Sequence, residues 1–142
     1  IAPIKYFSRP YIFSWTLPAS NVAALLKSLE ILMSPHGTSL IHSLKTNSNY
    51  LRLKFCNLGY KIVSRDNHIT SIKVGNEKKA GEIASRLYDA GIWVQKYINP
   101  AVPKGKALLR FTCMATHTQE QLDKVVGVME KNKKHLLTKE AS

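Results

Sequence analysis

The sequence predicts an α+β fold, in which helices pack on one face of a small antiparallel or mixed sheet. Several segments repeat apolar residues at helical spacing, three or four positions apart, whereas the shorter segments between them alternate apolar and polar residues. The chain has 142 residues, of which 44% are hydrophobic, so it is long enough for one domain with its own core. Helices and strands in this order are typical of an α+β sandwich.

The first part of the chain is predicted to contain two helices. Residues 1–15 read as mixed and extended. Pro18 suits the first position of a helix, and apolar residues recur at helical spacing from there to Met33. The cluster 34–37 interrupts this pattern, and a second helix follows until Gly59. The predicted buried side of the second helix consists of Leu40, Ile41, Leu44, Leu51, Phe55 and Leu58.

Short strands and two further helices are predicted in the rest of the chain. Asn76 can cap a helix that ends before Gly91. Thr118 and Gln121 form a capping box for the last helix. The predicted order is therefore α-α-β-β-α-β-β-α, with strands at Tyr60–Ser64, Ile69–Val74, Ile92–Tyr97 and Ala107–Cys113.

The chain is strongly basic, with 21 Lys and Arg residues against 9 Asp and Glu residues and a net charge of +12. A surplus of this size attracts anions. The densest cluster is Lys131, Lys133 and Lys134 at the end of the last helix, where cations suit the helix dipole. Three readings stay open: a solvated charged face, a nucleic-acid surface, and attraction of a coenzyme A phosphate or an acidic partner chain.

Several classes of site are not predicted. Cys56, Cys113 and the five histidines lack metal-ligand spacing, so we expect no metal site. The sequence contains no glycine-rich nucleotide loop, nucleophile elbow or acid–base pair, so we expect no catalytic residue on this chain. Apolar runs are short, which predicts no membrane span. The two cysteines are expected to be reduced core thiols, which favours the cytoplasm or an organelle matrix. A first residue other than methionine suggests a processed product or a fragment.

Arg110 is the most informative single residue. Alternation puts Leu109 and Phe111 on one face of the last strand and Arg110 on the other, with apolar residues on both sides of the arginine in the chain. A guanidinium keeps its charge and is costly to bury alone, so it needs an anionic partner. This partner is either an Asp or Glu of the same chain or the carboxylate of a substrate. The planar guanidinium has the shape of a fork and can bind a carboxylate with two parallel hydrogen bonds.

Two motifs resemble the α-oxoamine synthases, a family of pyridoxal-phosphate-dependent enzymes. One is N-P-A-V-P-K-G-K-A-L-L-R-F at residues 99–111, followed by A-T-H-T at 115–118. The other is F-S-R-P-Y-I-F-S-W-T-L-P at residues 7–18, which is similar to the family pattern R-P-[FY]-I-F-S-x-[ST]-L-P. The motifs occur in the family's order, and the similarity extends from about Tyr6 to Met129.

The resemblance implies that this chain is the C-terminal portion of a fold type I enzyme that condenses an amino acid with an acyl-CoA. Residues 1–34 would form the end of the large domain and a linking helix, and residues 35–142 the small domain. The pyridoxal phosphate cofactor would be bound mainly by the large domain, which carries the Schiff-base lysine and is not part of this chain. The chain alone would therefore be inactive, and its partners would be that large domain, on the same or another chain, and a second copy in a homodimer.

The resemblance also assigns roles to individual residues. Arg110 would hold the carboxylate of the amino-acid substrate. Thr16, and less directly Ser14, would offer a hydroxyl to the cofactor phosphate across the dimer interface, although either could simply cap the following helix. The proline loop could be a stiff surface turn, but it resembles the family's mobile flap at the acyl-CoA entrance, formed here by Pro100, Val102, Pro103, Lys104 and Gly105.

Two other functions remain open at this stage. The first is a stand-alone basic module that binds nucleic acid or an acidic partner, although no strand interleaves aromatic and basic residues as RNA-binding sheets do. The second is a regulatory subunit that keeps the fold and the dimer surface and has no chemistry of its own.

Overall fold

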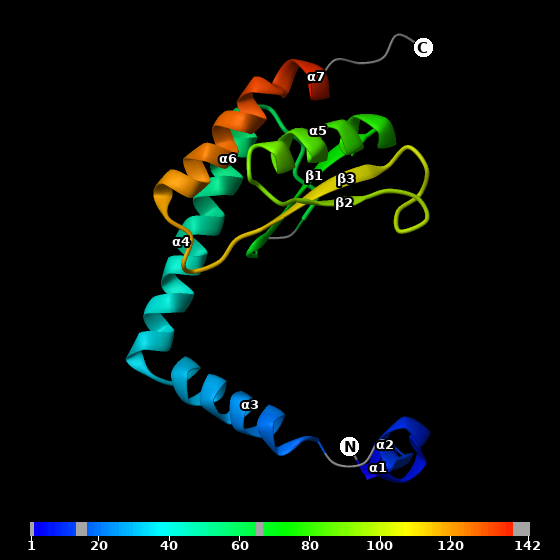
Figure 1. The fold of residues 1–142 in the computed structure, drawn as a ribbon, viewed down its shortest axis with the longest axis vertical. Coiled ribbons are helices and arrows are strands. Elements are labelled where there is room, and N and C mark those ends of the chain that lie inside the picture. The colour runs from blue at the N-terminus through cyan, green and yellow to red at the C-terminus, as the bar shows by residue number, and fades with distance from the viewer. Residues whose placement is uncertain (1, 14–16, 65–66, 138–142) are drawn as a thin grey trace. The chain divides into compact units, whose positions relative to one another are not determined.

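The computed structural model describes residues 2–13, 17–64 and 67–137, and the chain divides into two compact units (Figure 1). Unit one is Ile1–Thr38 and unit two is Ser39–Ser142. Unit two contains the sheet and most of the buried residues. Within the described ranges, no helix is long and apolar enough to cross a membrane.

Unit one is helical from its first described residues. It contains α1 (Ala2–Phe7), α2 (Arg9–Phe13) and α3 (Ala19–Leu32). The prediction of an extended segment over residues 1–15 was therefore wrong for most of its length. Pro3 and Pro10 each occupy the second position of a helix, where the missing N–H group has no intrahelical partner to lose.

The predicted interruption between the two helices is confirmed, but it covers only Met33 and Ser34, and residues 35–37 already belong to the next helix. α3 ends at Leu32, and α4 (Pro35–Asn57) begins after Ser34. The Gly37 N–H donates to the Ser34 hydroxyl at 3.2 Å and caps the new helix. A Cβ atom on Gly37 would lie 2.3 Å from the carbonyl oxygen of Ile31, so only glycine allows the backbones to approach this closely.

Unit two is built on a three-stranded antiparallel sheet with the order β1-β3-β2. The strands are β1 (Ile69–Gly75), β2 (Gln95–Tyr97) and β3 (Ala107–Thr112). In β3 the buried residues Ala107, Leu109 and Phe111 alternate with less buried ones, as predicted. The partners of Leu109 and Phe111 in β1, Ile72 and Thr70, are also buried, so these residues share one covered face.

Helices cover this face, which confirms the predicted α+β fold (Figure 1). They are the second half of α4, α5 (Glu77–Asp89) and α6 (Gln119–Lys131), and the short α7 (Lys133–Leu137) follows. Their largest buried contributions to the core are Phe55, Ile83, Leu87, Leu122 and Met129.

Two predicted strands are shorter than expected, because a side chain or the end of a helix binds backbone N–H groups that would otherwise pair in the sheet. The expected strand Tyr60–Ser64 forms only one bridge, between Ile62 and Ile72. There the Ser64 hydroxyl accepts the Ser71 N–H at 3.0 Å, which takes the place of a ladder bond. The expected strand Ile92–Tyr97 is paired only from Gln95, because the Ile92 N–H bonds back to Leu87 at the end of α5.

Both predicted N-terminal caps are confirmed. The Asn76 side chain accepts the Lys79 N–H at 3.0 Å. Thr118 and Gln121 form the complete capping box of α6. Gly91, with a φ of +75°, lies just after α5 in the left-handed conformation that commonly ends a helix.

Tyr60 makes the stability of this core sensitive to pH in the alkaline range. Its side chain is buried, and its hydroxyl donates to the Met129 carbonyl at 2.7 Å. Burial raises the pKa of Tyr60 from 10.0 to about 12. A group whose pKa is higher in the folded state than in the unfolded state stabilises the fold. This contribution is complete below the unfolded-state pKa and is lost as pH rises through the folded-state pKa.

We therefore expect Tyr60 to lose its stabilising contribution between about pH 10 and about pH 12. Urea unfolding of the wild type and of Tyr60→Phe across this range checks it. The variant should be less stable at pH 8 by about 1 kcal/mol, because the Met129 carbonyl loses the tyrosine hydroxyl and keeps the Asn132 N–H as a donor. The gap should then narrow as pH rises, and a gap that stays constant to pH 12 would contradict the proposed linkage.

Candidate functional site

Arg110 lies in the middle of the central strand, on the sheet face that the helices leave open. The register places Ser71 of β1 opposite it on one side and Gln95 of β2 opposite it on the other. The next row on the same face consists of Lys73, Leu108 and Tyr97. None of these five neighbours is acidic, so the open face around Arg110 carries positive charge.

The Arg110 guanidinium contacts Tyr97 of the neighbouring strand, and Tyr97 in turn bonds to Gln95. Its Nη1 donates to the Tyr97 hydroxyl at 2.6 Å, and that hydroxyl donates to Gln95 Oε1 at 3.1 Å. Its Cζ lies 5.7 Å from the centroid of the Tyr97 ring, within the range of a cation–π contact. Its Nε is buried and has no hydrogen-bond partner.

No carboxylate of the described residues pairs with Arg110. Of the two partners that the sequence left open, an internal Asp or Glu is therefore not found in the described part of the chain. A half-buried guanidinium with an unmet N–H donor is suited to an anion from outside, and a carboxylate matches its fork. Binding of a substrate carboxylate at this position stays a prediction.

The proline loop connects β2 to β3, so it belongs to the same hairpin as Arg110. Lys104 and Lys106 are exposed, and Val102 is half-buried with its N–H bonded to Ile98 at 3.2 Å. Gly105 has a φ of +75°, and the turn around it closes through the Lys106 N–H and the Pro103 carbonyl at 3.0 Å. The Asn99–Pro100 peptide bond is cis.

The two cofactor-phosphate candidates, Ser14 and Thr16, lie outside the described residues. Every described lysine is exposed or half-buried, so none lies in a closed pocket where a cofactor could be held away from water. No cluster of His, Cys, Asp and Glu in the described ranges could hold a metal ion either.

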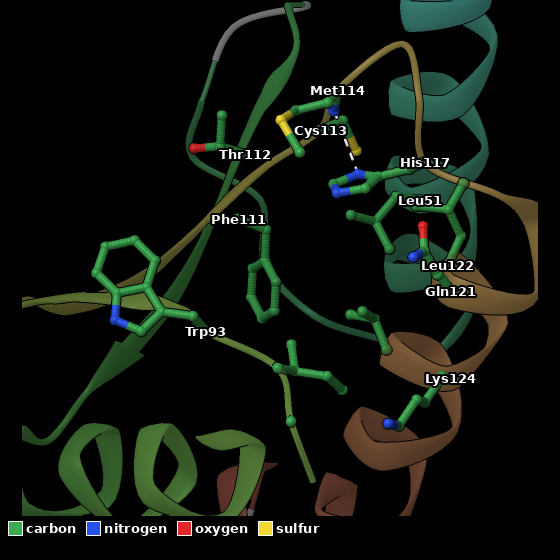
Figure 2. A pocket seen from close by; sticks show the side chains of 13 residues that line it. Leu51, Trp93, Phe111, Thr112, Cys113, Met114, His117, Gln121, Leu122 and Lys124 are labelled. Atoms are coloured by element: carbon green, nitrogen blue, oxygen red, sulfur yellow. Dashed lines mark hydrogen bonds between the residues drawn. The ribbon is translucent and has the colours of Figure 1, made fainter.

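A separate cavity of about 490 Å³ lies among the end of β3, α4, α6 and the turn after α5 (Figure 2). Phe111 points into it from the covered face of β3, opposite to Arg110, and Arg110 does not line it. Burial raises the pKa of the Cys113 thiol in its wall, which keeps the thiol protonated and a poor nucleophile. The cavity is mostly apolar, with Trp93 exposed on one side and Lys124 on another.

His117 has a local structural contact, as its position before the last helix suggests. Its Nδ1 accepts the Met114 N–H at 3.2 Å, drawn as a dashed line in Figure 2. The Asn47 side chain of α4 donates to the carbonyls of Met114 and His117 at 3.1 and 3.0 Å, which ties the turn to the helix. The first turn of α6 is capped nearby, and the Thr118 hydrogen bond lowers the pKa of Glu120.

Two residues of the Arg110 site, Tyr97 and Gln95, were not identified from the sequence. They lie two apart in a strand and so share a face, which the sequence could indicate. Their register opposite Leu108 and Arg110 depends on the length of the proline turn. That register is a property of the folded hairpin and could not be read from residue types.

Comparison with known proteins matches the chain along most of its length. The profile of the family described as aminotransferase class I and II matches residues 1–129. An 8-amino-7-oxononanoate synthase of Petrotoga mobilis is 36% identical over 135 residues, which are 95% of this chain and 34% of the synthase. A serine palmitoyltransferase of Sphingobacterium spiritivorum is 32% identical over 126 residues, or 89% of this chain and 31% of the relative.

A solved structure agrees with these matches. A variant of the serine palmitoyltransferase of S. paucimobilis, in a structure with a bound PLP–myriocin aldimine, superposes with a TM-score of 0.85 at 28% identity, over 95% of this chain and 34% of that chain. This chain thus spans about a third of the length of the curated relatives that it matches.

Proposed function

This chain belongs to the aminotransferase class I and II family, and we propose that it is the C-terminal part of a pyridoxal-phosphate-dependent acyltransferase that condenses an amino acid with an acyl-CoA. The predicted resemblance to α-oxoamine synthases is confirmed, because the relatives are synthases of this type. The observation that carries the proposal for this chain is the Arg110 guanidinium, which has no described carboxylate partner.

In this proposal Arg110 binds and orients the amino-acid substrate through its carboxylate. A carboxylate accepts two parallel N–H bonds from an arginine fork, and such charge-assisted pairs are stronger than neutral hydrogen bonds. The open sheet face supports this role, because Lys73 adds positive charge and no neighbouring acid competes for the fork. The fixed position of Arg110 in the central strand would also set the direction in which the amino acid enters.

The exposed apolar surface of unit one supports a large domain as its partner. None of the residues of α3 is buried in this chain. Apolar patches of this kind usually mark an interaction surface. We propose that residues 1–34 continue from the large domain and are covered by it, which would bury the exposed side chains of Val22, Leu25, Leu26, Leu29, Ile31 and Leu32.

The remaining assignments follow the same division. Pyridoxal phosphate would be held by the large domain, with Thr16 and Ser14 reaching the cofactor phosphate of the partner subunit in a homodimer. The loop with Pro100, Val102, Pro103, Lys104 and Gly105 would flank the acyl-CoA entrance. Its exposed Lys104 and the adjacent Lys106 could meet phosphate groups there.

The division of labour can be tested by separating the two parts. We expect this chain alone to bind no stoichiometric pyridoxal phosphate in equilibrium dialysis and to release no coenzyme A thiol from an acyl-CoA. The complete enzyme, meaning this chain joined to or assembled with its large domain, should release the thiol only when an amino acid is present. Amino-acid-dependent release by this chain alone, or none by the complete enzyme, would contradict the proposal.

A further inference from the structure

We propose that Tyr97 is a positioning residue for the substrate carboxylate, acting through Arg110. The inference rests on the proposed function, since it requires that Arg110 binds an α-amino acid. Tyr97 lies opposite Leu108 in the β2–β3 ladder, and Leu108 comes two residues before Arg110 in β3. This is the diagonal cross-strand position, which an aromatic side chain can reach.

The Tyr97 hydroxyl determines which nitrogen atoms of Arg110 remain for a ligand. It accepts from Nη1 at 2.6 Å, and it gives its own proton to Gln95 Oε1 at 3.1 Å. Because its proton is used by Gln95, the hydroxyl presents a lone pair to the guanidinium. Nη1 is thus occupied, whereas Nε has no partner and Nη2 has no hydrogen bond to the described residues.

Nε and Nη2 form one edge of the guanidinium, and this edge can donate two parallel bonds to a carboxylate. Without the hydroxyl, the long arginine side chain could rotate and present any of its donors. The tyrosine ring adds a second restraint, because the guanidinium carbon lies 5.7 Å from its centroid. Tyr97 and Gln95 therefore preorganise the fork toward one ligand geometry, that of a planar carboxylate.

The test uses the complete enzyme and compares Tyr97→Phe, which keeps the ring and removes the hydroxyl, with the wild type. The matched control is Tyr88→Phe, because Tyr88 is exposed on α5 and its hydroxyl bonds to no described residue. Calorimetry gives dissociation constants for glycine, L-alanine and L-serine, and for ethylamine as an amine without a carboxylate. We expect Tyr97→Phe to weaken the amino acids about tenfold and to leave ethylamine unchanged, and Tyr88→Phe to change neither.

Kinetics provide an independent readout. The KM for the amino acid should rise in Tyr97→Phe, with kcat and the KM for acyl-CoA nearly unchanged, because the residue acts on binding of one substrate. Gln95→Ala, which removes the acceptor of the tyrosine proton, should give a smaller change in the same direction. A fall in kcat with unchanged KM, or equal weakening of ethylamine and amino acids, would overturn the positioning role.

A double-mutant cycle separates the two proposals. If Tyr97 acts through Arg110, adding Tyr97→Phe to Arg110→Ala should change amino-acid affinity by less than about twofold. Additive effects would show that Tyr97 acts independently and would overturn this inference alone. If Arg110→Ala itself leaves amino-acid affinity unchanged, the proposed function of the arginine fails first, and the positioning role fails with it.

Discussion

Replacing Arg110 with alanine in the complete enzyme is expected to lower kcat/KM for the amino-acid substrate by about 10²- to 10³-fold. The substitution removes the only charged group on the central strand of the open face and leaves the substrate carboxylate without its fork. Steady-state kinetics with varied amino acid at saturating acyl-CoA measure the effect. The KM for acyl-CoA should stay close to that of the wild type, because Arg110 does not contact that substrate in this proposal.

Two further variants show whether the fork or the charge is responsible. Arg110→Lys keeps the charge and loses the planar fork, so it should recover only a small part of the lost kcat/KM. Lys78→Ala removes one positive charge from the exposed side of α5, and we expect a change of less than about threefold. Equal losses in Arg110→Ala and Lys78→Ala would point to a general field effect and would contradict the clamp.

The largest loss of stability is expected for Phe55→Ala. Phe55 is fully buried, and its ring packs against Tyr60 at a centroid distance of 6.1 Å and against Phe111 at 4.9 Å. Truncation leaves a cavity where α4 meets the sheet, and such changes cost about 3–5 kcal/mol. Urea denaturation of this chain, followed by circular dichroism, should show the midpoint shifted far below that of the wild type.

Leu53→Ala is the control for this prediction, since Leu53 lies two residues earlier in α4 and is 60% exposed. Its free energy of unfolding should change by less than about 0.5 kcal/mol. If Phe55→Ala and Leu53→Ala destabilise the chain equally, α4 does not pack on the sheet through the face described here. An unchanged midpoint for Phe55→Ala would have the same meaning.

Most helices and the central strand could be predicted, because they depend on local patterns. The alternation from Ala107 to Cys113 predicted which face of β3 is buried, and the capping residues Asn76 and Thr118 predicted where α5 and α6 begin. Predictions failed where tertiary hydrogen bonds compete with local preference. The Ser64 side chain accepts a backbone N–H of β1, so the expected strand Tyr60–Ser64 forms only one bridge. The Ile92 N–H bonds to the Leu87 carbonyl at the end of α5, so Ile92 does not join the sheet.

The candidate site was only partly predictable for the same reason. Arg110 could be found because an arginine between apolar residues in a strand is conspicuous in a sequence. Tyr97 could not, because its contact with Arg110 depends on the cross-strand register of the hairpin. Likewise, whether a carboxylate of the described residues pairs with Arg110 depends on how distant parts of the chain fold together, and none does.

The most direct test of the carboxylate clamp is a crystal structure of the complete enzyme with a bound amino acid. We predict that both carboxylate oxygens lie within about 3 Å of the Arg110 Nε and Nη2 atoms, while Nη1 keeps its bond to the Tyr97 hydroxyl. A carboxylate held by other residues, with Arg110 bonded to Tyr97 alone or to an acid of the large domain, would contradict the central claim.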